Sequence, residues 1–164
     1  MLSRNSSYEQ EAEFLEVKES QIPNSGRGLF LRKQRKKGEL VALFRGEVLS
    51  YEAAELRALK NEDGYFINMS NGTILDSMHV ECFAKYANDA HGLGKTKFKS
   101  NAQIQLSGRD DIACLVALRD IKAGEEIFTS YGKKYWKNFK SKRKVLLASE
   151  QTRIKPESQD IFPA

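Results

Sequence analysis

Hydrophobic residues along this chain come in short runs that are separated by glycine, asparagine and charged turns. Runs of this length, rich in β-branched and aromatic residues, are typical of β-strands. The pattern predicts strands near residues 14–18, 28–32, 39–44, 47–49, 64–70, 73–76, 101–106, 112–118 and 126–129. Because helices do not alternate with these strands, the pattern excludes a doubly wound parallel sheet and predicts a mostly β domain.

Only two helices are expected. Ser50 precedes residues 51–60, and a serine at this position can cap the N-terminus of a helix. A second helix is expected after Gly132, ending near Ala148. Between two predicted strands, Asn71-Gly72 predicts a type I′ hairpin turn, because both residues tolerate positive φ angles.

Composition places these elements in a single domain. A chain of 164 residues with 40% hydrophobic content can close one core but hardly two. We expect a flexible N-terminal tail over residues 1–13, a folded domain over 14–139, and a basic helix with a flexible tail over 140–164. The sequence contains neither an apolar run that could span a bilayer nor the apolar core of a signal peptide, which predicts an intracellular protein without a membrane partner.

The net charge, the cysteines and the histidines limit the kinds of partner and metal site to be expected. The net charge is +5 and the pI is about 9.1, so acidic partners are possible. The two cysteines, Cys82 and Cys114, lie far apart in apolar contexts, where buried free thiols are expected. His79 and His91 are the only histidines and lack neighbours at metal-ligand spacing, so no metal site is expected.

Three segments punctuated by glycine, asparagine or tyrosine carry candidate chemistry. Taken alone, each also fits a plain turn or a packed ring, and the glycine pair of the first lacks both the third glycine and the following helix of a dinucleotide site. The segments are Gly26-Arg27-Gly28-Leu29-Phe30; Lys85-Tyr86-Ala87-Asn88-Asp89 with Ser100-Asn101-Ala102; and Gly124-Glu125-Glu126-Ile127-Phe128-Thr129-Ser130-Tyr131-Gly132.

In this order, the three segments resemble the motifs of SET-domain protein lysine methyltransferases, and the resemblance extends over about residues 14–139. It implies a SET fold of several small β-sheets with a few short helices and a knot-like thread that involves the C-terminal strand. It also implies methyl transfer from S-adenosylmethionine to a lysine side chain of a protein, with a histone tail as the expected substrate. A nuclear rather than a cytoplasmic location would follow.

The resemblance also assigns residues to the site. Tyr131 is similar to the family's catalytic tyrosine, which orients the lysine amine and the methyl group. The residues expected to bind the cofactor are Gly26, Arg27, Gly28, Lys85, Tyr86, Asn88, Asp89, Tyr131 and Trp136. The residues expected to line the channel for the substrate lysine are Phe44, Tyr65, Phe66 and Thr129. A desolvating channel would suit the reaction, because the attacking amine must be neutral.

The sequence departs from the family pattern at several places. Phe44 replaces the usual tyrosine and so lacks a hydroxyl, and Asp89 replaces a histidine. The Asp89 carboxylate can cap its loop through backbone hydrogen bonds or can repel a neighbouring anion. The loop 90–99 is longer than usual, and no cysteine follows Tyr131 to form a zinc cap. We expect the helix after Gly132 to replace that cap, with Trp136 packing on the adenine, on the channel rim or in the core.

Two other functions remain open. The Lys33-Gln34-Arg35-Lys36-Lys37 turn and the cationic helix after Gly132 have the composition of nucleic-acid-binding segments, although neither matches a groove-reading motif. Nucleic acid is therefore a secondary candidate partner. Phe44 and Asp89 also fit a catalytically inactive SET-like module that binds lysine tails.

Overall fold

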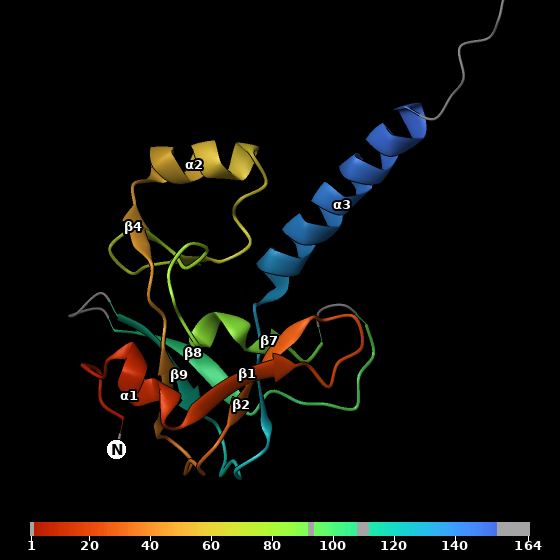
Figure 1. Ribbon diagram of the computed structural model, residues 1–164. Coiled ribbons are helices and arrows are strands. Elements are labelled where there is room, and N and C mark those ends of the chain that lie inside the picture. The colour runs from red at the N-terminus through yellow and green to blue at the C-terminus, as the bar shows by residue number, and fades with distance from the viewer. Residues whose placement is uncertain (1, 92–93, 108–111, 154–164) are drawn as a thin grey trace, which may run out of the picture. The chain divides into compact units, whose positions relative to one another are not determined.

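The computed structural model describes residues 2–91, 94–107 and 112–153. The chain divides into two compact units, Met1–Ser130 and Tyr131–Ala164. The first unit holds three small sheets and short helices, and the second holds the helix α3, Lys133–Arg153 (Figure 1). The end of the folded domain at residue 139 stays a prediction.

The three sheets use every strand that the hydrophobic pattern predicts, each within two residues of its predicted bounds. The first sheet has the order β1 (Leu15–Glu19), β2 (Arg27–Leu31), β10 (Glu126–Thr129) and β7 (Asn88–Asp89). The second has the order β3 (Leu40–Leu43), β9 (Ile112–Ala117) and β8 (Ala102–Ser107). The third has the order β4 (Glu47–Leu49), β6 (Ile74–Asp76) and β5 (Phe66–Asn68). The mostly β fold is confirmed.

The strand β10 is inserted between two segments that come much earlier in the chain. It pairs antiparallel with β2, where Ile127 lies opposite Leu29, and parallel with β7, where Phe128 lies opposite Asn88. The expected knot-like thread involves this C-terminal strand, and the pairing of β10 with both β2 and β7 agrees with that expectation.

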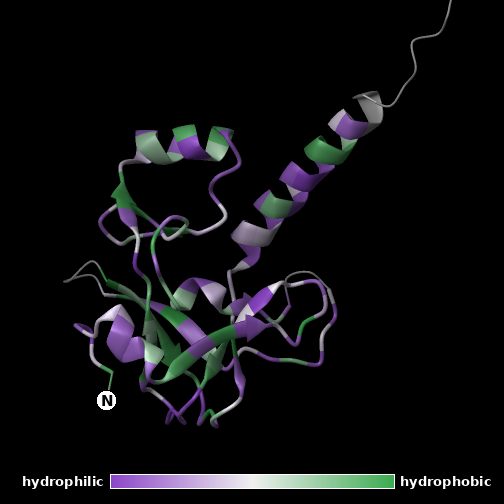
Figure 2. Ribbon diagram, viewed as in Figure 1, coloured by the Kyte–Doolittle hydropathy of each residue, from purple (hydrophilic) through white to green (hydrophobic). Residues whose placement is uncertain are grey.

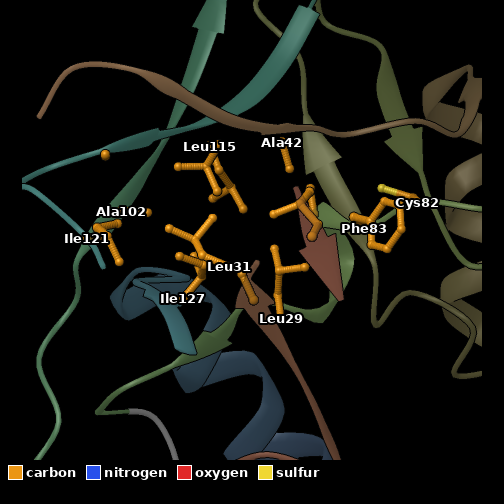
Figure 3. Close-up of a cluster of buried hydrophobic side chains, with 14 residues drawn as sticks. Leu29, Leu31, Ala42, Cys82, Phe83, Ala102, Leu115, Ile121 and Ile127 are labelled. Atoms are coloured by element: carbon orange, nitrogen blue, oxygen red, sulfur yellow. The ribbon is translucent and has the colours of Figure 1, made fainter. Parts of the chain in front are cut away.

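The main core lies where the first two sheets meet. Four side chains from β2, β9 and β10 are fully buried in this one cluster: Leu29, Leu31, Leu115 and Ile127 (Figure 3). Burial of a leucine or isoleucine side chain contributes roughly 1.5–3 kcal/mol, so these side chains fix β10 against β2. Both cysteines are free and buried, as expected.

Short helices precede or connect the strands of the first unit. They are α1 (Tyr8–Ala12), α2 (Tyr51–Leu59) and the 3₁₀ helix η1 (Ala84–Tyr86). The Ser50 hydroxyl accepts a hydrogen bond from the Ala53 N–H at 3.2 Å, which confirms the predicted N-cap of α2. Within the described residues, no helix is both long and apolar enough to cross a membrane.

The N-terminal segment differs from the flexible tail expected over residues 1–13. Ser7 and Gln10 form a capping box that begins α1. The Tyr8 ring stacks on Phe83 with a centroid separation of 4.5 Å, and the Glu11 carboxylate accepts a hydrogen bond from the Leu43 N–H at 2.8 Å. These tertiary contacts, which a polar sequence pattern does not reveal, hold residues 8–12 on the domain.

The hairpin at Asn71-Gly72 is present, but its turn type is not the predicted one. Gly72 has a φ of +84°, whereas Asn71 is not among the residues with positive φ. A type I′ turn needs positive φ at both positions. Instead, the Asn71 side chain accepts a hydrogen bond from the Thr73 N–H at 3.0 Å, an Asx turn that stabilises the loop locally.

Candidate active site

The two glycines at the start of β2 are needed for different reasons. Gly26 has a φ of +68°, a conformation that residues with a Cβ rarely adopt. A Cβ placed there would meet no atom within 4 Å. Gly28 has no such backbone demand, but a Cβ there would lie 2.2 Å from Glu126 Oε1. Gly26 therefore shapes the loop and leaves its backbone open, whereas Gly28 makes room for a side chain from β10.

That side chain, Glu126, is the centre of a buried polar cluster. It is 2% exposed. Its Oε1 accepts a hydrogen bond from the Ser20 hydroxyl and its Oε2 accepts one from the Gln21 N–H, both at 2.7 Å. Hydrogen bonds to a carboxylate are stronger than those between neutral groups, and they offset the cost of burying this charge. Glu126 thus ties the β1–β2 loop to the last strand of the first unit.

Asn88 links this cluster to β7. Its Nδ2 donates to the Arg27 carbonyl at 3.0 Å and lies 3.4 Å from Glu126 Oε1. Within the described part of the chain, its Oδ1 has no hydrogen-bond donor. The side chain is therefore held in place by its nitrogen, while its oxygen can accept a hydrogen bond from a ligand.

Asn101 holds β10 from another direction. The buried amide donates from Nδ2 to the Glu126 carbonyl and accepts at Oδ1 from the Phe128 N–H, both at 2.8 Å. Its own N–H donates to the Phe128 carbonyl at 3.0 Å. One side chain thus replaces part of a neighbouring strand and fixes the backbone that leads to Thr129.

Asp89 and Thr129 lie opposite each other in the β7–β10 pair. The Asp89 carboxylate accepts a hydrogen bond from the His91 N–H at 2.8 Å, so it caps its own loop, one of the two roles considered for it. Thr129 is 1% exposed, and its Oγ1 has no hydrogen-bond partner among the described residues. A buried hydroxyl without a protein partner can bind a water molecule or a polar group of a substrate.

Lys85 has its three N–H donors occupied within the protein. Its Nζ donates to the carbonyls of Ser77, Met78 and Val80 at 3.1, 3.3 and 3.0 Å. The ammonium also lies 5.7 Å from the centroid of the Tyr65 ring and 5.5 Å from that of Tyr86. These contacts stabilise the 77–80 turn, and they give no support to the expected role of the Lys85 side chain in cofactor binding.

The residues expected to line a lysine channel lie in separate packing clusters. Phe44 packs with Met69, Leu75 and Ala113, whereas Phe66 packs with Leu49, Ala54 and Ile74 beside α2. Tyr65 is 41% exposed. The lining of the channel therefore stays a prediction.

Beside β10 there is a cavity of about 420 Å³. Its lining includes Phe98, Arg119, Glu125 and Phe128, but none of the residues expected to bind the cofactor. Arg119 and Glu125 pair at 3.1 Å, and the hydrogen bond from Arg119 lowers the pKa of Glu125. The cavity therefore borders the Glu126 cluster, since Gln21 and Glu126 line it, but neither Gly26 nor Asn88 does.

In the second unit, Tyr131 belongs to a cluster of aromatic rings. It stacks on Trp136 with a centroid separation of 5.9 Å and meets the edge of Tyr135 at 4.9 Å. Phe139 lies 5.5 Å from Trp136 and 6.5 Å from Tyr135. Trp136 thus packs on other rings of its own unit, and Tyr131 lies two residues beyond Thr129 in the chain.

Sequence reasoning missed the structural roles of Glu126 and Asn101. A signal for Glu126 was available, because it is a carboxylate at the start of a strand whose other positions are apolar or small. Such a residue is expected to be either exposed or fully bonded, and only the fold shows which.

These features define a β domain of small sheets in which a glycine-containing loop and an asparagine are held against a buried C-terminal strand that leads to a tyrosine. A family model described as the SET domain matches residues 26–132. The chain belongs to the SET-domain family, which is a family of protein lysine methyltransferases, and the resemblance found in the sequence is confirmed.

One solved structure similar to this chain is a humanized mutant of the Chaetomium thermophilum Polycomb Repressive Complex 2 bound to the inhibitor GSK126. The TM-score is 0.60 and the sequence identity is 25% over 72% of this chain. The match covers only 15% of that chain, so this protein corresponds to a small part of it. No curated protein sequence matches significantly.

Proposed function

We propose that this protein transfers a methyl group from S-adenosylmethionine to a lysine side chain of another protein. A histone tail is the first acceptor to test, because it is the substrate that the resemblance to SET-domain methyltransferases implies. A histone substrate would place the protein in the nucleus. The observation that carries the proposal is Asn88, whose amide nitrogen is held by the Arg27 carbonyl beside the glycine loop while its oxygen stays available.

The residues present fit this cofactor. Its amino-acid portion carries an ammonium, a hydrogen-bond donor that suits the carboxamide oxygen of Asn88. Gly26 leaves open space where a side chain would project, so a ligand can approach the backbone of the loop closely. Trp136 stays the predicted stacking partner of the adenine ring, because aromatic rings are the side chains on which adenine stacks. S-Adenosylmethionine, when bound, supplies a methyl group activated by its sulfonium.

The protein's own task is to prepare the substrate amine. An unperturbed lysine has a pKa of about 10.4, so only about one molecule in a thousand is neutral near pH 7. Burial of the amine disfavours its charged form and raises that fraction. We assign the orientation of the neutral amine to the Tyr131 hydroxyl and a supporting contact, direct or through water, to Thr129 Oγ1.

The decisive experiment combines cofactor binding with methyl transfer. The full chain is incubated with cofactor labelled in its methyl group and with recombinant histones or total lysate, and Kd for the cofactor is measured by calorimetry. We expect transfer by the wild type and a loss of about 100-fold in kcat for Tyr131→Phe, because misplacing the reacting groups costs about this much. Tyr135→Phe, which alters another ring of the same cluster, should retain activity.

Asn88→Ala tests the cofactor assignment separately. Loss of one hydrogen bond to a charged group should weaken cofactor affinity by about tenfold, with a smaller effect on turnover of the saturated enzyme. If the wild type binds the cofactor but labels no protein, the chain is an inactive SET-like module and the enzymatic proposal fails.

A further inference from the structure

The positive charge of this chain comes entirely from the first half of α3. Seven of the twelve residues 133–144 are lysine or arginine, and none is acidic. The rest of the chain has 20 Lys and Arg against 22 Asp and Glu, a net charge of −2. Basicity is thus a local property of one helix and not of the folded domain.

Four of these cations form a stripe along one face of the helix. Lys133, Lys137, Lys140 and Lys144 follow the spacing i, i+4, i+7, i+11. At 100° per residue they fall within a sector of about 60°, and they extend over about 16 Å along the axis. All four are exposed, and none forms an ion pair among the residues that the structure describes. We call this set the lysine stripe.

The apolar residues of α3 do not form one continuous face with the lysine stripe. Tyr135 and Phe139 project from the other side of the helix, Trp136 lies between them and the stripe, and the three rings contact one another. Beyond them, the exposed side chains of Val145, Leu146 and Leu147 are consecutive and therefore point in directions about 100° apart. Figure 2 shows α3 as mostly hydrophilic, with scattered hydrophobic positions. The helix thus lacks the continuous apolar face that a membrane surface or a protein groove requires.

We propose that the lysine stripe binds the phosphate backbone of double-stranded nucleic acid. Exposed lysines on a rigid helix can neutralise successive phosphates, and the release of condensed counterions then drives binding. A protein partner would need an apolar or aromatic anchor next to the charges, but the ring beside the stripe, Trp136, already packs on Tyr131, Tyr135 and Phe139. The stripe also contains no arginine for bidentate recognition of bases, so binding is independent of sequence. The inference does not depend on methyl transfer.

The test compares two faces of the same helix in the full chain. A labelled DNA duplex of random sequence is titrated at several salt concentrations and followed by fluorescence anisotropy. The stripe variant combines Lys137→Gln, Lys140→Gln and Lys144→Gln. The matched control combines Lys134→Gln, Lys142→Gln and Arg143→Gln, which remove the same charge from the other faces. Glutamine keeps helix propensity, and circular dichroism should show equal helix content in both.

Four phosphate contacts predict that affinity falls roughly 100-fold between about 50 and 200 mM salt. The stripe variant should reduce the slope of log K against log salt by about 2.7, and the control by less than about 1. Equal reductions in the two variants would show diffuse attraction and overturn the proposal. So would an absence of binding by the wild type, or tighter stripe-dependent binding to polyglutamate than to DNA, which would indicate an acidic protein partner.

Discussion

Charged residues serve different purposes in the two units of this molecule. In the first unit, Glu126 is buried and accepts hydrogen bonds from two loop donors, and Lys85 gives its three N–H groups to backbone carbonyls. In α3, by contrast, four lysines are exposed on one face without an acidic neighbour in residues 133–144. Charges of the first kind hold loops and turns of the fold in place, and charges of the second kind are exposed to solvent. Composition alone does not separate them.

If the first unit depends on close contact between Gly28 and Glu126, then Gly28→Ala should have the largest effect. The new Cβ would lie 2.2 Å from a carboxylate that its other hydrogen bonds hold in place. We expect a loss of about 3 kcal/mol in the free energy of unfolding. Urea denaturation should be followed by circular dichroism, because the single tryptophan, Trp136, lies in the other unit.

Gly26→Ala is the control for this change. It introduces the same methyl group into open space, and only the positive φ opposes it, at a cost of about 1 kcal/mol. Equal losses in the two variants would mean that Glu126 moves aside easily and that the close contact is unimportant.

A second comparison uses two adjacent glutamates. Glu126→Gln keeps the shape but places an NH₂ group opposite hydrogen-bond donors, so we expect a loss of about 2 kcal/mol in the free energy of unfolding. Glu125→Gln weakens a partly exposed pair with Arg119 and an exposed hydrogen bond from the Lys122 N–H, for which we expect about 0.5 kcal/mol in total. Urea denaturation of both variants measures the difference. If Glu125→Gln were the more damaging change, the buried cluster would not be what holds the loop.

The smallest expected effect concerns Glu11, whose carboxylate is fully buried and lies 3.4 Å from Arg45. Burial raises the pKa of Glu11 above its usual 4.5. The protonated form is therefore favoured in the folded state, and the stability it contributes is lost as the pH rises through the folded pKa. Glu11→Gln stays neutral and keeps an acceptor for the Leu43 N–H.

Thermal unfolding of the wild type and of Glu11→Gln, at a series of pH values below and above 4.5, measures how the stability difference between them changes. The stability of the wild type relative to Glu11→Gln should decline as the pH rises above 4.5. A constant or opposite difference would show that the ion pair with Arg45 outweighs the cost of burial.

The family, and the strands other than the two-residue β7, could be predicted because both depend on local patterns. Short apolar runs give the strand positions, and the three motifs around Gly28, Asn88 and Tyr131 are contiguous in sequence. The helix α1 was missed although Ser7 and Gln10 form a local capping box, because a five-residue helix depends on Tyr8 packing on Phe83 and on the burial of Glu11, contacts between distant segments. The support given to the loop by Glu126 was hidden for the same reason, since Ser20 and Gln21 lie over a hundred residues away.

The insertion of β10 also constrains the order in which the domain can fold. Its partners β2 and β7 are synthesised long before it, yet they have no direct pairing with each other, and the sheet order places β10 between them. Until residues 126–129 emerge, Leu29 lacks Ile127 opposite it and Asn101 lacks the backbone groups that it holds. Pairings of such large sequence separation form slowly. A chain stopped before β10 would therefore remain an open, aggregation-prone intermediate, and the last strand made is the one that closes the domain.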